Sequence, residues 1–140
     1  MLIVPMPSHG KDSIGLYSNG TWYLRNSNTS GPVDIQFTWG SPGMIPVVGD
    51  WNNDAIDTPG LFSGGTWYLS NRNGINGVDS LFAWGAPTDQ PISGNWDYTG
   101  GDTVGVFRSG QWLLRNVNAS GPVDVSFAWG GPGQIATPGQ

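Results

Sequence analysis

The residues that could catalyse a reaction are few in this chain. Its 140 residues include one histidine, His9, and no cysteine, and no serine lies in the Gly-x-Ser-x-Gly context of a nucleophile elbow. Asp34, Asp79 and Asp124 occupy one place in a repeated pattern, so we expect them to cap turns. A catalytic acid and base would need two unlike environments. The inventory favours a protein that is not an enzyme.

Tryptophan is the other residue type that suggests chemistry, since the chain contains eight. Flat aromatic faces can stack on sugar rings, while asparagine and aspartate bond to hydroxyl groups. Most of these tryptophans recur at fixed positions, which favours a packing role. Trp51 and Trp96 flank loops and have no counterpart in the first third of the chain, so they are the candidates for ligand stacking. Carbohydrate binding is therefore kept as an alternative function.

A pattern of 45 residues recurs three times and must position these side chains. Its clearest part is a Gly-x-Trp-x-Leu-x-Asn stretch, at residues 20–26, 65–71 and 110–116. Other residues keep the same spacing without a gap: Asp12, Asp57 and Asp102; Gly15, Gly60 and Gly105; Phe37, Phe82 and Phe127; Trp39, Trp84 and Trp129; Pro42, Pro87 and Pro132. The chain is predicted to be a repeat protein.

Each repeat is expected to contain four short strands and no helix, because apolar residues alternate or run in short stretches between Gly, Asn, Ser and Pro. Ser63-Gly64-Gly65 is short enough for a tight hairpin, whereas the connection from Asn71 to Gly77 is a longer polar loop. In the middle copy the expected strands are 45–49, 58–62, 66–69 and 78–84.

Four antiparallel strands that recur every 40–45 residues or so are typical of a β-propeller blade. A solenoid is the alternative, but its rungs are usually shorter. Trp67, Tyr68, Phe82 and Trp84 are expected to fill the space between blades. The predicted fold is all-β, with blades at residues 1–43, 44–88 and 89–133, and with residues 134–140 as the surplus first strand of a further blade.

Three blades cannot close a ring, because closed propellers have about four to eight. An open arc would expose large apolar faces on both terminal blades. We therefore expect homo-oligomerisation to close the ring, through a homodimer with six blades or, as the alternative, a homotrimer with nine. Each terminus resembles the first strand of the middle repeat: aligned without gaps, 2–4 falls on 47–49 and 135–139 on 45–49. Either terminus could pair with the first blade of a neighbouring copy.

Charge and hydropathy exclude several classes of partner. The net charge is −5 with five Lys and Arg residues, too few basic groups for a nucleic-acid surface. The apolar stretch 1–4 meets Pro5 and Pro7, far short of a signal-peptide core or a membrane helix. We expect no nucleic acid and no membrane as partners, and no signal peptide in this chain.

The chain resembles bacterial propeller repeats of the VCBS or FG-GAP type over nearly its whole length. The matching residues of the middle copy are Pro46-Val47-Val48-Gly49-Asp50-Trp51, the polar loop to Asp57, and Gly60-Leu61-Phe62. The resemblance implies a secreted or surface-attached binding or scaffolding module. It also implies that the loop binds Ca²⁺, with Asp50, Asn52, Asp54 and Asp57 as ligands, since calcium takes oxygen donors.

The same loop has a second interpretation, which stays open here. Aspartate and asparagine in a hairpin connection often bond to their own backbone. Asn53 and Ala55 also occupy places where the family prefers glycine, and the third repeat has Thr99 where a carboxylate would be needed. The function expected from the sequence is a non-enzymatic, self-assembling scaffold or binding module, with a multivalent lectin as the alternative.

Overall fold

The computed structural model describes residues 2–3, 6–8, 11–74 and 77–138. All regular elements in these ranges are β-strands, so the expected all-β class is confirmed. The described residues contain no helix long and apolar enough to span a bilayer. His9 lies outside the described residues.

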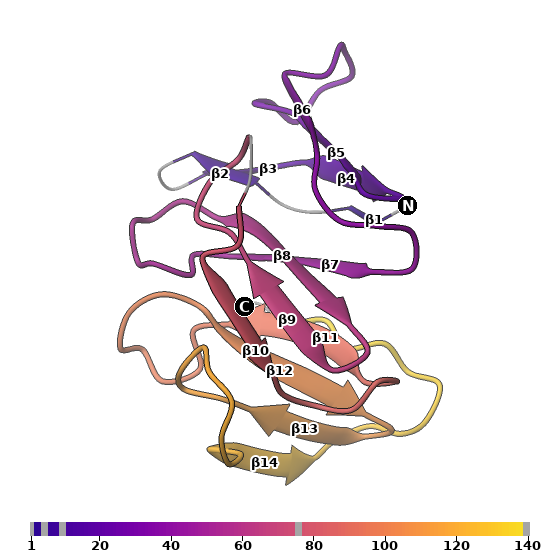
Figure 1. Cartoon of the computed structure of the whole chain (residues 1–140), viewed down its shortest axis with the longest axis vertical. Coiled ribbons are helices and arrows are strands. Elements are labelled where there is room, and N and C mark those ends of the chain that lie inside the picture. Colours follow the sequence, from indigo (N-terminus) through magenta and orange to yellow (C-terminus); the bar gives the residue numbers. More distant parts are fainter. Residues whose placement is uncertain (1, 4–5, 9–10, 75–76, 139–140) are drawn as a thin grey trace.

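Three four-stranded antiparallel sheets follow one another along the chain (Figure 1). The first contains β1 (Leu2–Ile3), β4 (Gly15–Ser18), β5 (Thr21–Leu24) and β6 (Ile35–Thr38). The second contains β7 (Ile45–Gly49), β8 (Thr58–Ser63), β9 (Thr66–Leu69) and β10 (Ser80–Ala83). The third contains β11 (Gln90–Gly94), β12 (Thr103–Arg108), β13 (Gln111–Leu114) and β14 (Val125–Ala128). Within the described residues the sheets stay open, and no barrel is closed.

The middle repeat tests the strand predictions directly. Strands β7 and β9 have the expected bounds, β8 is one residue longer, and β10 covers only the centre of the expected 78–84. The turn after β8 is a tight hairpin, as predicted. Gly64 and Gly65 both have positive φ angles, of 58° and 91°, which is the conformation that a two-residue hairpin of this twist requires.

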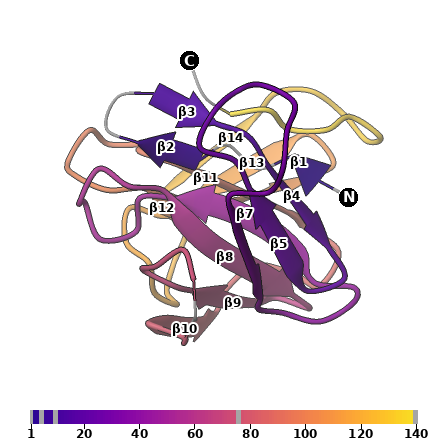
Figure 2. The same cartoon turned by 90° about the horizontal axis from the view of Figure 1, so that it is seen from above.

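The start of the chain departs from the ungapped alignment. Leu2 pairs with Tyr17, and the corresponding pair in the second sheet is Ile45 with Phe62. Leu2 is therefore the counterpart of Ile45 rather than of Val47, so the expected equivalence of 2–4 with 47–49 is wrong by two residues. The chain between β1 and β4 also contains an unpredicted hairpin, β2 (Met6–Ser8) with β3 (Lys11–Ser13), at the rim of the stack (Figure 2).

One aromatic arrangement recurs in all three sheets. In the second sheet the ring of Trp67 stacks on Phe82, with centroids 6.3 Å apart, and meets Phe62 at a tilt, 4.9 Å away. The Trp67 indole N–H donates to the Trp84 carbonyl over 2.8 Å. The same contacts are made in the first and third sheets by these residues: Tyr17, Trp22, Phe37 and Trp39; Phe107, Trp112, Phe127 and Trp129.

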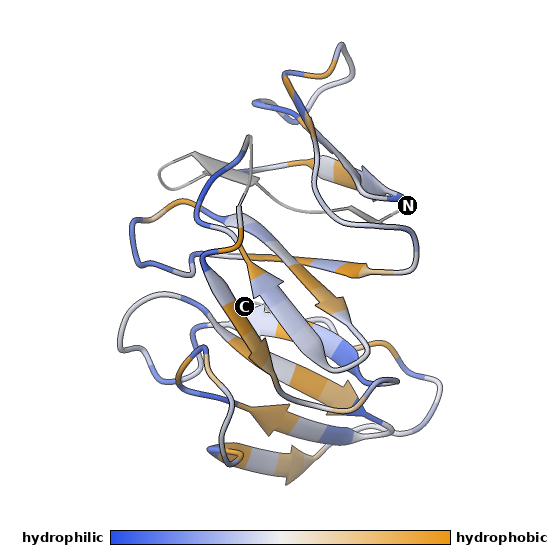
Figure 3. Ribbon diagram, viewed as in Figure 1, coloured by the Kyte–Doolittle hydropathy of each residue, from blue (hydrophilic) through white to orange (hydrophobic). Residues whose placement is uncertain are grey.

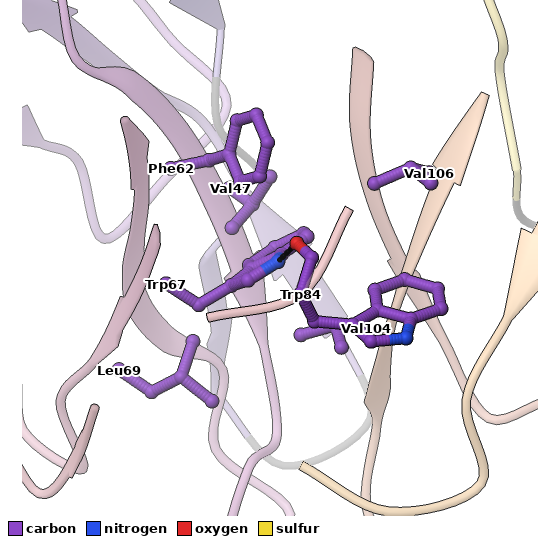
Figure 4. Packing of buried hydrophobic residues seen from close by; sticks show 7 residues of the cluster. All are labelled: Val47, Phe62, Trp67, Leu69, Trp84, Val104 and Val106. Carbon is purple, nitrogen blue, oxygen red and sulfur yellow. Dashed lines mark hydrogen bonds between the residues drawn. The ribbon is translucent and has the colours of Figure 1, made fainter. Parts of the chain in front are cut away.

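The hydrophobic core consists of layers between consecutive sheets. Figure 4 shows the second layer, where Trp84 of the second sheet is directed toward Val104 of the third. Val106 belongs to the same cluster, and Leu113 packs against it. In the first layer, Leu61 and Tyr68 of the second sheet pack on the first. Each sheet therefore covers the tryptophan-bearing face of the sheet before it.

Candidate functional site

The loop from Asp50 to Ile56 uses its carboxylates to bind its own backbone. Asp50 Oδ1 accepts a hydrogen bond from the Asp54 N–H, and Asp50 Oδ2 accepts one from the Ala55 N–H, both over 2.9 Å. Asp54 Oδ1 accepts from the Ile56 N–H, and Asp54 Oδ2 accepts from the Asn52 side-chain amide. The interpretation of this loop as a self-bonded connection is confirmed.

Asp57, the fourth residue implied as a ligand, has a different environment. It is the last residue of the loop before β8. Burial, and after it the carboxylates of Asp102, Asp12 and Asp50 in that order, together raise its pKa to about 7. Asp102, whose own pKa is raised by burial, accepts a hydrogen bond from the Asp50 N–H over 2.9 Å.

Each carboxylate oxygen of Asp50 and Asp54 accepts a single hydrogen bond from the loop. An ionised carboxylate has about four lone-pair acceptor sites, so the hydrogen bonds are compatible with a bound cation as well as with a self-bonded loop. No cluster of three or more acidic, histidine or cysteine side chains suited to a metal ion occurs among the described residues. Calcium binding stays a prediction of the family resemblance.

Trp51 and Trp96 lie in the loops that follow β7 and β11, and their rings lie over the last residue of each strand. The Trp51 indole N–H donates to the Thr58 carbonyl over 3.0 Å, and its ring lies so close to Gly49 that a Cβ there would be 2.7 Å away. Trp96 covers Gly94 in the same way, at 2.6 Å. Both rings have a packing role, and no contact in the structure favours their use as a sugar platform.

The tryptophan-bearing face of the third sheet is covered only in part, by the segment after β14, whereas the next sheet covers the same face of the other two. Trp84 is 8% exposed beneath the third sheet, whereas its counterpart Trp129 is 74% exposed. Phe37 is 9% exposed, whereas Phe127 is 45% exposed. Figure 3 shows hydrophobic residues along β14, at the lower edge of the three sheets. The same aromatic surface is thus buried in one position and open to solvent in another.

A hollow of about 410 Å³ lies on this face. Its walls come from the third sheet and from the segment after β14, and the principal residues are Phe107, Trp112, Trp129, Gln134, Ile135 and Ala136. We call the face that holds this hollow the trailing face. In the first layer, Leu61 of the second sheet packs against the corresponding aromatic residues of the first sheet.

The first sheet has the complementary uncovered face, which we call the leading face. Leu61 and Tyr68 of the second sheet cover the first sheet; their counterparts 45 residues earlier are Leu16 and Tyr23. Leu16 is exposed, and Tyr23 is half-buried. Both border an open, mainly apolar hollow of about 380 Å³. The leading face and the trailing face therefore correspond to the two surfaces that meet in each layer between consecutive sheets.

One ion pair distinguishes the second layer from the first. Asp89, whose side chain is fully buried, accepts two hydrogen bonds from Arg108, from Nε over 2.7 Å and from Nη2 over 2.8 Å. Asp89 Oδ2 also accepts the Ala86 N–H. At the trailing face Gln134 takes the place of Asp89, and its Oε1 accepts the Gly131 N–H over 2.7 Å.

Comparison of the chain with protein-family models, with curated proteins and with solved structures found no match.

The three-blade pattern predicts apolar faces at both ends of the chain but not which residues form them. The periodicity is the same in all three copies, so it cannot tell Trp84 from Trp129. The one signal that could have separated them is their position in the chain, since Trp84 is followed by another repeat within these 140 residues.

Proposed function

We propose that this chain is a non-enzymatic, self-associating scaffold or binding module, whose sheets are propeller blades and whose ring is closed by further copies. The observation that carries the proposal is the contrast between Trp84, buried under the next sheet, and Trp129, exposed to solvent. A second copy whose leading face covers the trailing face would bury Trp129 as the third sheet buries Trp84.

The chemistry of the two faces supports this joint. Leu16 and Tyr23 would contact the trailing face as Leu61 and Tyr68 contact the first sheet. Burial of apolar area contributes roughly 25 cal/mol per Å², and patches larger than a few hundred Å² on a monomer usually mark an interaction surface. A homodimer with six blades falls within the usual range of propellers, and a homotrimer with nine is the alternative.

The native mass tests the proposal. Light scattering of dilute protein should return about two or three times the chain mass of 14.9 kDa, and two times is the expected result. A chain that stays at 14.9 kDa at concentrations up to the millimolar range would overturn the proposal. Residues outside the described ranges are kept in the protein for this measurement.

A further inference from the structure

The segment after β14 lies where the first strand of a fourth sheet would begin. Gln90, the first residue of β11, binds both backbone groups of Ala136: its Oε1 accepts the Ala136 N–H over 2.9 Å, and its Nε2 donates to the Ala136 carbonyl over 3.0 Å. The Ala136 side chain is buried with Ile92 and Phe107. The first strands of the second and third sheets are joined in a similar way, since Ser93 Oγ donates to the Val48 carbonyl over 2.6 Å.

The orientation of Ala136 is that of a first strand. Its counterparts at intervals of 45 residues are Pro46 and Pro91, which pair with Leu61 and Val106 in β8 and β12. Proline has no N–H to give to the ladder, so at this position the backbone does not donate to the second strand. Ala136 likewise directs its N–H and carbonyl to Gln90 and away from the place of a second strand.

The structure assigns no strand to residues 134–138. In a strand, backbone groups of successive residues alternate between the two edges, so once 135–138 pairs as a first strand, those of Ile135 and Thr137 would face the edge opposite Gln90. They make no hydrogen bond to any residue that the structure describes. That edge is open for pairing.

In the proposed joint, the strand at this edge is β4 of the second copy. By the register of Ile45 with Phe62 and of Pro46 with Leu61, Ile135 would pair with Tyr17, and Ala136 with Leu16. In the single chain those two positions are taken by β1, through Leu2 with Tyr17 and Ile3 with Leu16. The strand β1 of one copy and the segment 135–138 of another could therefore pair with the same edge of β4, but not at the same time.

We propose that association exchanges these strands: the segment 135–138 of one copy replaces β1 as the first strand of the first sheet in the next copy. This inference rests on the proposed self-association. The segment is already fixed by Gln90, so it loses little freedom on pairing. The strand β1 has two residues, whereas β7 and β11 have five each, so the exchange gives the first sheet a longer inner strand. Backbone pairing to a sheet edge also fixes the register of the joint.

A disulfide can report this register, because the chain has no native cysteine. Ala136 and Leu16 would form a non-hydrogen-bonded pair, with Cα atoms about 4.5 Å apart, within the range that a disulfide bridges. The variants Ala136→Cys and Leu16→Cys are purified separately, mixed and mildly oxidised, so only a link between chains can join them. The matched control replaces Leu16→Cys with Ser18→Cys, which is two residues further along β4 and therefore on the same side of the strand.

We expect the Ala136→Cys and Leu16→Cys mixture to form the mixed disulfide at least about tenfold faster than the off-register mixture, because proximity sets the rate. Removal of residues 135–140 should weaken assembly at least about tenfold, whereas removal of residues 1–4 should leave it unchanged or strengthen it. Circular dichroism and the melting temperature confirm that each variant is folded.

The two proposals fail in different ways. A wild-type chain that is monomeric at every concentration overturns both the self-association and the exchange. A stable oligomer whose on-register and off-register mixtures link at equal rates overturns the exchange alone. An oligomer that survives removal of residues 135–140 and is lost on removal of residues 1–4 also overturns the exchange but not the self-association.

Discussion

Ala55 has a backbone conformation that suits glycine. Its φ angle is 67°, a left-handed conformation that costs a residue with a Cβ roughly 1–2 kcal/mol. The loop keeps this shape because both oxygens of Asp50 bind backbone N–H groups within it. The positive φ angle is a physical reason to expect glycine to be favoured at this position.

Ala55→Gly is expected to stabilise the protein by about 0.5–1 kcal/mol, since the relief of strain exceeds the entropy that glycine adds to the unfolded chain. Chemical denaturation measures the change. The matched control is Ala83→Gly in β10, where the backbone is extended and a loss of about 0.5–1 kcal/mol is expected. Equal losses in both variants would contradict the prediction.

Asp57 makes stability depend on pH. Its pKa is raised to about 7 by burial first and then by the carboxylates of Asp102, Asp12 and Asp50, against about 3.9 in an unfolded chain. Between these values the folded protein holds a proton that the unfolded chain has released. The free energy of unfolding therefore falls as pH rises from about 4 to about 7, and this contribution is constant above that range.

Asp57→Asn is expected to reduce that slope, because the amide cannot release a proton. Part of the slope should remain, since burial also raises the pKa of Asp102. Urea titrations at a series of pH values between 4 and 8 measure the effect. A slope that is the same in the variant and in the wild type would show that Asp57 does not titrate as inferred.

Among the contacts between secondary-structure elements, the side chain of Asp89 connects the second sheet to the third. It binds the Ala86 N–H of its own loop and Arg108 of β12. Gln134, at the equivalent place, shows that an amide can accept the loop N–H without an ion pair. The two contributions of Asp89 can therefore be separated by substitution.

Asp89→Gln should cost at most about 1 kcal/mol, because Arg108 is half exposed and the loop hydrogen bond is kept. Asp89→Ala should cost about 2 kcal/mol or more, because it also leaves the Ala86 N–H without its partner. Thermal and chemical denaturation compare the two variants. If both lose the same free energy, the loop hydrogen bond contributes nothing.

The sequence was most informative about the strands and the turns. Alternation and glycine pairs predicted the bounds of β7 and β9, and the recurring aspartates were predicted to cap turns. That role is confirmed, since the Asp34, Asp79 and Asp124 carboxylates accept the backbone N–H of residues 26, 71 and 116 over 2.7–2.8 Å. These features depend on contacts within one repeat, which a local pattern determines.

Two features that depend on which segments of a repeat pair with each other could not be predicted. The two-residue shift at β1 follows from pairing with β4, and ungapped spacing does not contain it. The Asn73 Oδ1 atom is buried and has no hydrogen-bond partner among the residues that the structure describes, because Pro59 stands where Val104 donates its N–H to Asn118 in the third sheet. Only the structure brings these residues together.

At the scale of the whole molecule, the trailing face should govern association. Trp129→Lys is expected to convert the oligomer to a folded monomer, because it places a charge in the centre of the proposed joint. Leu81→Lys is the matched control, since Leu81 is 62% exposed on β10 and belongs to neither end face. Light scattering and circular dichroism of both variants check the result. Equal oligomer masses would contradict the role given to Trp129.

The leading and trailing faces are different surfaces, and this difference determines how growth could end. A joint between unlike patches is directional: each molecule that joins hides one patch and brings a fresh copy of it at the far end. The last leading face and the last trailing face bury each other only if the rotations between successive copies add up to a full circle. A small change in the angle between sheets would therefore convert a closed ring into an open filament. In concentrated samples such filaments would keep growing and raise the viscosity, whereas rings have a fixed size.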